Sequence, residues 1–182
     1  MRWTTLGGQY DWTAKRYPDI APPPFPGDIK NLLESVWTHT RAEAAIVNLY
    51  SPGDTLSVHR DVAEASAHGL VSVSLGCDAV FVIGVSSSQS APGDSSTDRG
   101  EEGEVQEKII TLRLRSGSAV YMSGPSRFAW HGVPQIVKGT CPEYLASWPA
   151  VDGNGVGEGE YEAWRGWMAG KRVNLNVRQM WD

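Results

Sequence analysis

The sequence RVNLNVRQ, residues 172–179, alternates polar and apolar side chains from Arg172 to Arg178. Because successive side chains of a β-strand point to opposite faces, this alternation predicts a strand with two arginines and two asparagines on one face and an apolar core face behind them. The alternative interpretation is an edge strand whose charged face is solvated. Taken by itself, the stretch favours that alternative, so its role depends on the rest of the chain.

Segments rich in valine, isoleucine and aromatic residues, separated by glycine and proline, precede this stretch. Such segments are typical of short β-strands, and many short strands in one domain indicate a sandwich, a jelly roll or a barrel. We therefore predict that residues 1–182 form a single, mainly β domain with one or two flanking helices. Strands are expected at residues 44–50, 56–61, 70–75, 79–85, 108–115, 119–122, 127–133 and 172–180.

One amphipathic helix is expected to follow the proline-rich residues 22–26, with Asp28 as its N-cap. Two polar stretches, residues 86–107 and 152–160, are expected to be flexible loops, and a short helix is expected after the second of them. The apolar stripe of the first helix, at helical spacing, consists of Ile29, Leu32, Leu33, Val36 and Trp37.

The composition limits the classes of function. A net charge of −5 and a pI of about 5.4 would not attract nucleic acid over the whole surface, so a nucleic-acid role needs a local basic patch.

Two cysteines give neither a disulfide framework nor a Cys-x-x-Cys metal motif, so we expect an intracellular protein, in the nucleus, cytoplasm or mitochondrion. No apolar run approaches membrane-spanning length, and we expect no membrane partner. The chain starts without a signal-peptide pattern, and we expect a shortened piece of a longer protein.

The stretch LSVHRD, residues 56–61, has two interpretations. The catalytic loop of a protein kinase, H-R-D-x-x-x-x-N, requires an asparagine where this chain has Ser66, and a D-F-G motif is absent from the sequence, so this interpretation is excluded. If the stretch is a strand, His59 and Asp61 share one face and Arg60 points to the other. An imidazole and a carboxylate side by side can bind one metal ion.

A second histidine would complete the 2-His-1-carboxylate triad that suits non-haem Fe(II). His39 ends the expected helix and His68 precedes a glycine in an expected loop, whereas His131 lies on an expected strand. We therefore prefer His131, although a H-x-D triplet alone is more often structural than metal-binding.

The arginine-bearing strand supplies a second kind of chemistry. Arginine forms bidentate, charge-assisted hydrogen bonds with carboxylates, so Arg172 and Arg178 together would suit a small dicarboxylate such as 2-oxoglutarate. Asn48 and Tyr50, at positions i and i+2 of another expected strand, offer neutral donors of the kind that orient a carboxylate.

These motifs together carry a resemblance to a known family. The segments NLYSPGDTLSVHRD (48–61), LVSVSLGCDAVFVIG (70–84), RLRSGSAVYMSGPSRFAWHGV (113–133) and RVNLNVRQ, in that order, resemble the AlkB family of Fe(II)/2-oxoglutarate-dependent dioxygenases. RWTTLG and RAEAAIVNLY are similar to the AlkB homologue 1 branch in particular. The resemblance covers nearly the whole chain outside the two polar stretches, and it implies a double-stranded β-helix, or jelly roll.

The resemblance also implies roles for individual residues. His59, Asp61 and His131 match the iron ligands of the family. Arg172, assisted by Tyr50 and Asn174, matches the arginine that binds the distal carboxylate of 2-oxoglutarate.

The second arginine of the strand matches a different position of the family's site. Arg178, assisted by Asn48, matches the arginine near the carboxylate that chelates iron. Fe(II), 2-oxoglutarate and O₂ are therefore the expected cofactor and cosubstrates.

The family often oxidises N-methyl groups of nucleobases, releasing formaldehyde, succinate and CO₂, which predicts a demethylase of methylated tRNA or DNA. The founding bacterial member has LGW, with a base-stacking tryptophan, where this chain has LGG at residues 6–8. Tyr10, Trp12 and Trp130 are candidate substitutes, although both tryptophans also suit a core. An acidic residue that helps to read the base is replaced by Ala63.

Other partners follow less directly from the sequence. Basic residues that could contact phosphates are Lys15, Arg16, Arg127 and Lys138. The acidic balance also allows an oxygenase of a basic protein such as a histone, and the incomplete lid over residues 1–27 allows a non-catalytic binding module. A zinc hydrolase ranks lower, because it would have no use for the arginine-bearing strand. We expect a monomer.

Overall fold

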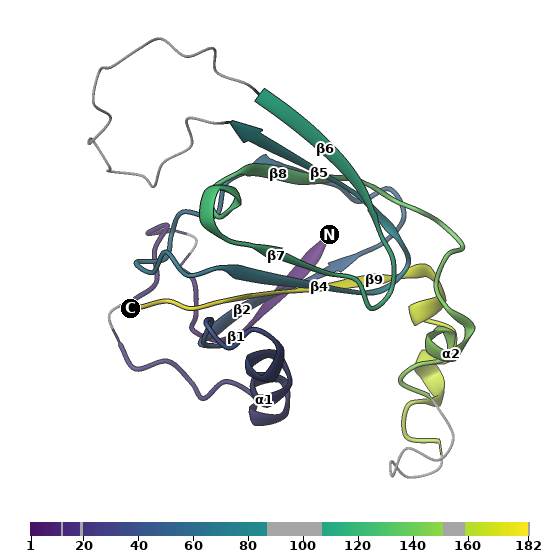
Figure 1. Ribbon diagram of the computed structural model, residues 1–182. Helices are drawn as coiled ribbons and strands as arrows, with labels where there is room; N and C mark the ends of the chain where they lie inside the picture. Colours follow the sequence, from purple (N-terminus) through teal and green to yellow (C-terminus); the bar gives the residue numbers. More distant parts are fainter. Residues whose placement is uncertain (12, 19, 87–106, 151–158, 182) are drawn as a thin grey trace, which may run out of the picture.

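Two antiparallel sheets face each other in the computed structural model, which describes residues 1–11, 13–18, 20–86, 107–150 and 159–181 (Figure 1). The larger sheet contains, in spatial order, β1 (Arg2–Gly7), β2 (Ala44–Tyr50), β9 (Arg172–Arg178), β4 (Leu70–Gly76) and β7 (Ala119–Met122). The smaller sheet contains β3 (Leu56–His59), β8 (Trp130–Ile136), β5 (Ala79–Ser86) and β6 (Glu107–Leu114). The predicted mainly β jelly roll is confirmed.

The position of β9 decides between the two interpretations of its alternating sequence. It is hydrogen-bonded to β2 on one side and to β4 on the other, so it is a central strand and the edge-strand alternative is wrong. Its polar face points between the sheets, where Arg172 is 1% exposed and Arg178 is 3% exposed. Its apolar residues Val177 and Leu175 point to the opposite face.

The helix α1 (Gly27–Val36) covers that opposite face of the larger sheet (Figure 1). Leu33 is buried there, which contributes about 2 kcal/mol by removal of apolar surface from water. Leu32 and Val36 are 67% and 61% exposed, so the predicted apolar stripe is wider than the face that the helix buries.

The start of α1 also differs from the prediction. Its N-cap is Pro26, and the carboxylate of Asp28 instead accepts a hydrogen bond from the backbone N–H of Ile29 at 2.8 Å.

Of the two strands next to the site, one is shorter than predicted and the other is displaced along the chain. β3 ends at His59 rather than at Asp61, and β8 begins at Trp130 after a 3₁₀ turn, η1 (Gly124–Ser126). Pairing between the two strands reaches the pair His59–His131.

The remaining helical segments are short. They are α2 (Glu143–Ala146), η2 (Glu162–Trp164) and η3 (Met168–Gly170), so two 3₁₀ turns stand where one short helix was predicted. The loops predicted at residues 86–107 and 152–160 lie for the most part outside the described residues. Among the helices that are described, none is long and apolar enough to cross a membrane.

Candidate metal and cosubstrate site

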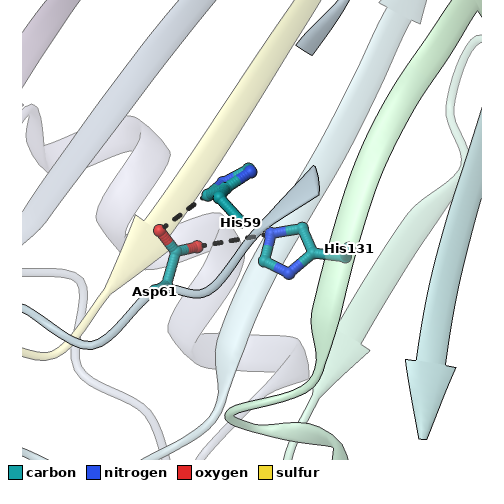
Figure 2. Close-up of side chains that lie close together, drawn as sticks. All are labelled: His59, Asp61 and His131. Carbon is teal, nitrogen blue, oxygen red and sulfur yellow. Dashed lines mark ion pairs between the residues drawn. The ribbon is translucent and has the colours of Figure 1, made fainter. Parts of the chain in front are cut away.

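The three predicted metal ligands lie together at the end of the smaller sheet. His59 on β3 pairs directly with His131 on β8, so both side chains share the inner face, with ring centroids 4.4 Å apart. Asp61 lies just beyond β3, and its two carboxylate oxygens are 3.6 Å from His131 Nε2 and 4.0 Å from His59 Nε2 (Figure 2). One ligand atom from each residue lies within 4.8 Å of the others. His39 and His68 are exposed and are not part of this cluster.

Backbone carbonyls fix which nitrogen of each imidazole faces the cluster. His59 Nδ1 lies 2.9 Å from the carbonyl oxygen of Ser57, and His131 Nδ1 lies 3.0 Å from that of Ala129. Since a carbonyl oxygen can only accept, each Nδ1 must carry the proton, which leaves the lone pair on Nε2, toward Asp61. Metal-binding histidines in proteins are oriented by this type of second hydrogen bond.

Burial and neighbouring charges hold Asp61 and His131 in their metal-binding protonation states. Burial alone would raise the pKa of Asp61, but Arg178, His131 and His59 outweigh it and hold that pKa below its usual value. Burial lowers the pKa of His131, with further lowering by His59 and Arg178. At neutral pH the site therefore presents a carboxylate and a neutral imidazole.

The residues predicted to hold 2-oxoglutarate line the central strands of the larger sheet. Asn174 on β9 pairs with Asn48 on β2, and Arg172 pairs with Tyr50, so all four side chains point between the sheets. The Arg172 guanidinium lies over the Tyr50 ring, 5.0 Å from its centroid, and donates one hydrogen bond to Ser74 Oγ at 3.0 Å.

Unsatisfied donors mark both ends of this row. The buried atoms without a hydrogen-bond partner among the described residues include the Tyr50 hydroxyl, Arg172 Nε and Nη1, and Arg178 Nε and Nη2; the others are the Tyr17 hydroxyl and Asn176 Oδ1. Each buried unpaired polar group costs about 1–3 kcal/mol, so two such sets favour an anionic ligand with a carboxylate near each.

Arg178 lies at the metal end of the row. Its Nη1 is 3.6 Å from an oxygen of Asp61 and 2.6 Å from an oxygen of Glu64. Both carboxylates raise the pKa of Arg178 against the effect of burial, so the guanidinium stays charged. These residues fit a resident Fe(II) at the histidines and a 2-oxoglutarate molecule between Arg172 and Arg178.

Asn176 is a site residue to which the sequence assigned no role. Its Nδ2 donates to Asp61 Oδ2 at 3.2 Å. The signal was present in the alternation of β9, which puts Asn176 on the same face as Asn174.

A pocket of about 550 Å³ contains this site and is also lined by Trp3 and Tyr10, which form its aromatic mouth. Tyr10, a predicted substrate residue, lines the pocket, and its ring makes an edge contact with Tyr17 at 5.2 Å between centroids. Trp3 also lines it, although it was not predicted. Because Trp3 pairs with Asn48 across β1 and β2, its side chain faces the same interior.

The other substrate candidates do not join this mouth. Trp130 precedes His131 on β8, so it points to the outer face of the smaller sheet, where it is 50% exposed, and Trp12 lies outside the described residues. The space beside Gly8 is filled by Met180, because a Cβ at Gly8 would lie 2.2 Å from Met180 Sδ. A tryptophan at this base-stacking position of the family would require the Met180 side chain to move.

Two arginines differ from their predicted positions. Arg127 was a candidate for phosphate contacts, but it is 1% exposed, so it cannot contact a phosphate. Arg60 was expected to point away from the metal ligands, but it lies beyond the end of β3 and lines the pocket.

Comparisons with known proteins agree with this geometry. The sequence profile of the 2OG-Fe(II) oxygenase superfamily matches residues 1–178. A Cryphonectria parasitica protein named N6-methyladenosine RNA demethylase ALKBH is 53% identical over 186 residues, which cover 100% of this chain and 76% of that protein. The tRNA demethylase abh1 of Schizosaccharomyces pombe is 43% identical over 188 residues, which cover 99% of this chain and 53% of that protein.

More distant proteins extend the same pattern. The DNA N(6)-methyladenine demethylase ALKBH1A of Arabidopsis thaliana is 33% identical over 99% of this chain and 49% of its own length. A solved structure titled "The structure of OsALKBH1" superposes with a TM-score of 0.66 over 97% of this chain and 77% of that one, at 20% identity, which supports the fold. The chain belongs to the 2OG-Fe(II) oxygenase superfamily, within which it groups with AlkB homologue 1 proteins.

Proposed function

We propose that this chain is an Fe(II)- and 2-oxoglutarate-dependent demethylase of N-methylated adenine in RNA or DNA. The observation that carries the proposal is the single pocket that joins the metal ligands, the carboxylate-binding arginines and an aromatic mouth. The names of the relatives support the nucleobase substrate, because they specify RNA, tRNA and DNA demethylases.

The residues of the pocket divide the work between binding and orientation. Bound Fe(II), with 2-oxoglutarate and O₂, supplies the oxidising chemistry that converts the N-methyl group to a hydroxymethyl group, which leaves as formaldehyde. His59, Asp61 and His131 would hold the metal, and Arg172 and Arg178 would orient 2-oxoglutarate beside it. Binding both in one pocket would limit oxidation to a substrate that enters through the mouth.

In this proposal, Trp3 and Tyr10 would receive the base. A methylated base that leaves its stack can pack its face on an aromatic side chain, an interaction that contributes about 1–3 kcal/mol for each base. Trp3 lines the pocket and is 46% exposed, which places its indole at the rim. Since the net charge is −5, this local contact rather than the overall field would supply the affinity.

The experiment is a demethylation assay with defined substrates. The purified chain, with Fe(II), 2-oxoglutarate and ascorbate, would be incubated with single-stranded oligonucleotides that carry 1-methyladenine or N6-methyladenine, as RNA and as DNA. We expect loss of the methyl group by mass spectrometry, matched by equal amounts of formaldehyde and substrate-dependent succinate. His131→Ala is the inactive control.

Each other outcome has a defined meaning. Steady succinate formation without demethylation of any oligonucleotide would overturn the nucleobase substrate and direct the search to a basic protein. No succinate at all from protein that binds the metal would overturn the enzymatic assignment and favour a binding module.

A further inference from the structure

Asp61 lies outside the hydrogen-bonded ladder that holds the two histidines. The pairing of β3 with β8 reaches His59 and His131, and the chain then runs without regular secondary structure through residues 60–69. A carboxylate ligand in such a segment needs other contacts to hold its backbone. The backbone N–H groups of Ala65 and Ser66 each donate to the carbonyl oxygen of Met180 at 3.1 Å. Nearer to the ligands, the contacts with the main chain come from two arginines that the metal and 2-oxoglutarate sites leave unused.

These two arginines connect the metal-bearing segments in both directions. Arg60, between the ligands His59 and Asp61, donates from Nε to the carbonyl oxygen of Phe128 at 2.7 Å. Arg127, four residues before His131, donates from Nη1 to the carbonyl oxygen of Asp61 at 2.9 Å. Each segment therefore places a guanidinium on the main chain of the other.

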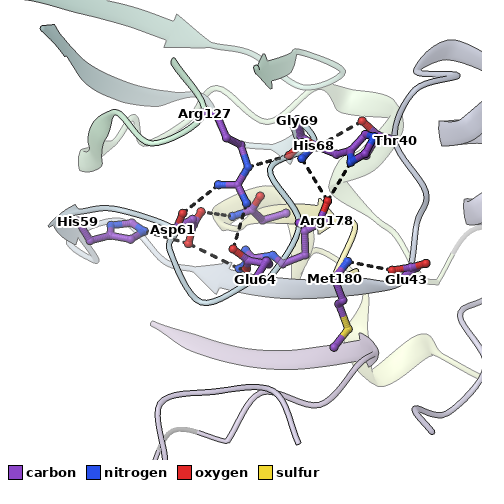
Figure 3. A network of polar contacts seen from close by, with 12 residues as sticks. Thr40, Glu43, His59, Asp61, Glu64, His68, Gly69, Arg127, Arg178 and Met180 are labelled. Atoms are coloured by element: carbon purple, nitrogen blue, oxygen red, sulfur yellow. Dashed lines mark hydrogen bonds and ion pairs between the residues drawn. The ribbon is translucent and has the colours of Figure 1, made fainter. Parts of the chain in front are cut away.

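The second of these contacts is fully enclosed. Arg127 also donates from Nε to the carbonyl oxygen of His68 at 2.7 Å, so one guanidinium fixes both ends of the irregular segment (Figure 3). Its Nη2 is paired at 3.1 Å with Glu64, whose side chain is 0% exposed and whose other oxygen contacts Arg178. Two guanidinium charges thus share one buried carboxylate, and every nitrogen of Arg127 has a partner.

We propose that Arg60 and Arg127 form a reciprocal arginine clasp that positions Asp61 for metal binding. Both are positioning residues, because they act on the backbone of the ligand-bearing segments and not on the metal. The clasp assigns a role to Arg60. It rests on the metal site of the proposed function and is independent of the nucleic-acid substrate.

The geometry explains why arginine serves at both positions. A guanidinium presents several N–H donors in a fixed plane, so Arg127 can hold two carbonyls and a carboxylate at once, which an ammonium cannot do in the same directions. Contacts of this indirect kind typically change metal affinity about 10–100-fold when they are removed, because the ligand loses its orientation.

The first test removes the more accessible half of the clasp. We would measure the dissociation constant of Mn²⁺ for the 182-residue chain and for Arg60→Ala, by EPR titration, together with the absorption spectrum of bound Co²⁺. We expect about tenfold weaker Mn²⁺ binding and an altered Co²⁺ spectrum in Arg60→Ala, and partial recovery of both in Arg60→Lys. Arg165→Ala is the matched control, because Arg165 Nε also donates at 2.7 Å but in the surface pair with Glu162, and it should bind Mn²⁺ as the unchanged chain does.

The second test addresses Arg127. Arg127→Lys keeps a positive charge beside Glu64 but loses the planar set of donors, so we expect a larger loss of Mn²⁺ affinity than in Arg60→Ala, among variants whose circular dichroism shows a folded chain. If Arg127→Lys does not fold, the comparison of Arg60→Ala with Arg60→Lys decides alone.

The outcomes separate this inference from the proposed function. Mn²⁺ affinity within twofold of the unchanged chain, with an unchanged Co²⁺ spectrum, in folded Arg60→Ala would overturn the clasp. Failure of the unchanged chain to bind Mn²⁺ would overturn the metal site itself, and with it both proposals. A metal-binding chain that demethylates no oligonucleotide would leave the affinity series as a valid test of the clasp.

Discussion

The two ends of the pocket are built on different parts of the larger sheet. Arg172, Asn174 and Arg178 lie on β9, which is hydrogen-bonded on both sides, and all three are buried. Trp3 lies on β1, at the edge of the sheet, and is 46% exposed. The cosubstrate end is therefore fixed by backbone ladders, whereas the mouth is held by one neighbouring strand and can vary without disturbing the core. Substitutions at the two ends should separate oxidation from substrate recognition.

The largest effect is expected for His131→Ala, which removes a metal ligand. Removal of indirect contacts costs about 10–100-fold in metal affinity, so loss of a direct ligand should weaken Mn²⁺ binding by more than about 100-fold. Titration with Mn²⁺ followed by EPR would measure this, and Mn²⁺ should no longer raise the Tm of the variant. His39→Ala, at an exposed histidine, is the control. Unchanged Mn²⁺ stoichiometry in His131→Ala would contradict the site.

The next effect is expected for Arg172→Ala, at the end of β9 away from the metal ligands. Loss of a buried charged partner of a carboxylate costs about 2–5 kcal/mol, so the Kd of 2-oxoglutarate should rise about 100-fold. Isothermal titration of 2-oxoglutarate into the Mn²⁺-bound chain would show it, while Mn²⁺ affinity itself should change little. Arg115→Ala, at an exposed arginine, should change neither. A normal Kd for 2-oxoglutarate in Arg172→Ala would place the dicarboxylate elsewhere.

The sequence predicted the cosubstrate end better than the mouth for a physical reason. Strict alternation in β9 determines which side chains share a face, whatever strands lie beside it, so the sequence correctly predicted that Arg172 and Arg178 lie on one face. Trp3 could not be placed in this way, because its position at the pocket depends on the pairing of β1 with β2. Pairing between distant segments leaves little local signal in a sequence.

Local sequence patterns also could not predict where strands end or which charged residues are buried. Arg60 was assigned to the wrong face because β3 ends at His59, two residues before the predicted end, and strand alternation does not apply beyond it. Arginine is usually exposed, so the sequence suggested that Arg127 lies on the surface. Its burial depends on Glu64, which lies far away in the sequence. A buried charge is tolerated where a partner of opposite charge is present, and that partner is visible only in the folded chain.

A smaller and more selective effect is expected for Trp3→Ala, at the mouth. Loss of a stacking surface of about 1–3 kcal/mol should raise the KM for a methylated oligonucleotide about tenfold, whereas 2-oxoglutarate turnover without substrate should not change. Trp3→Phe should keep part of the affinity. Trp164→Ala, at another exposed tryptophan, is the control. An equal loss of substrate-free turnover in Trp3→Ala would mean that the mouth and the cosubstrate end are not separable.

The smallest effect is expected for Trp130→Ala, although Trp130 is adjacent in sequence to a metal ligand. The two side chains of this pair lie on opposite faces of β8, and surface substitutions usually change stability by no more than about 0.5 kcal/mol. Trp130 is also not among the residues that line the pocket, so Mn²⁺ affinity, the Kd of 2-oxoglutarate and the oligonucleotide KM should all stay within about twofold of those of the unchanged chain. An increase in oligonucleotide KM as large as that of Trp3→Ala would show that the nucleic acid also crosses the outer face of the smaller sheet. Substrate recognition would then involve residues beyond Trp3 on β1. The fixed interior and the variable mouth would in that case determine only how the base binds, and the outer face of the smaller sheet would bind the rest of the polynucleotide.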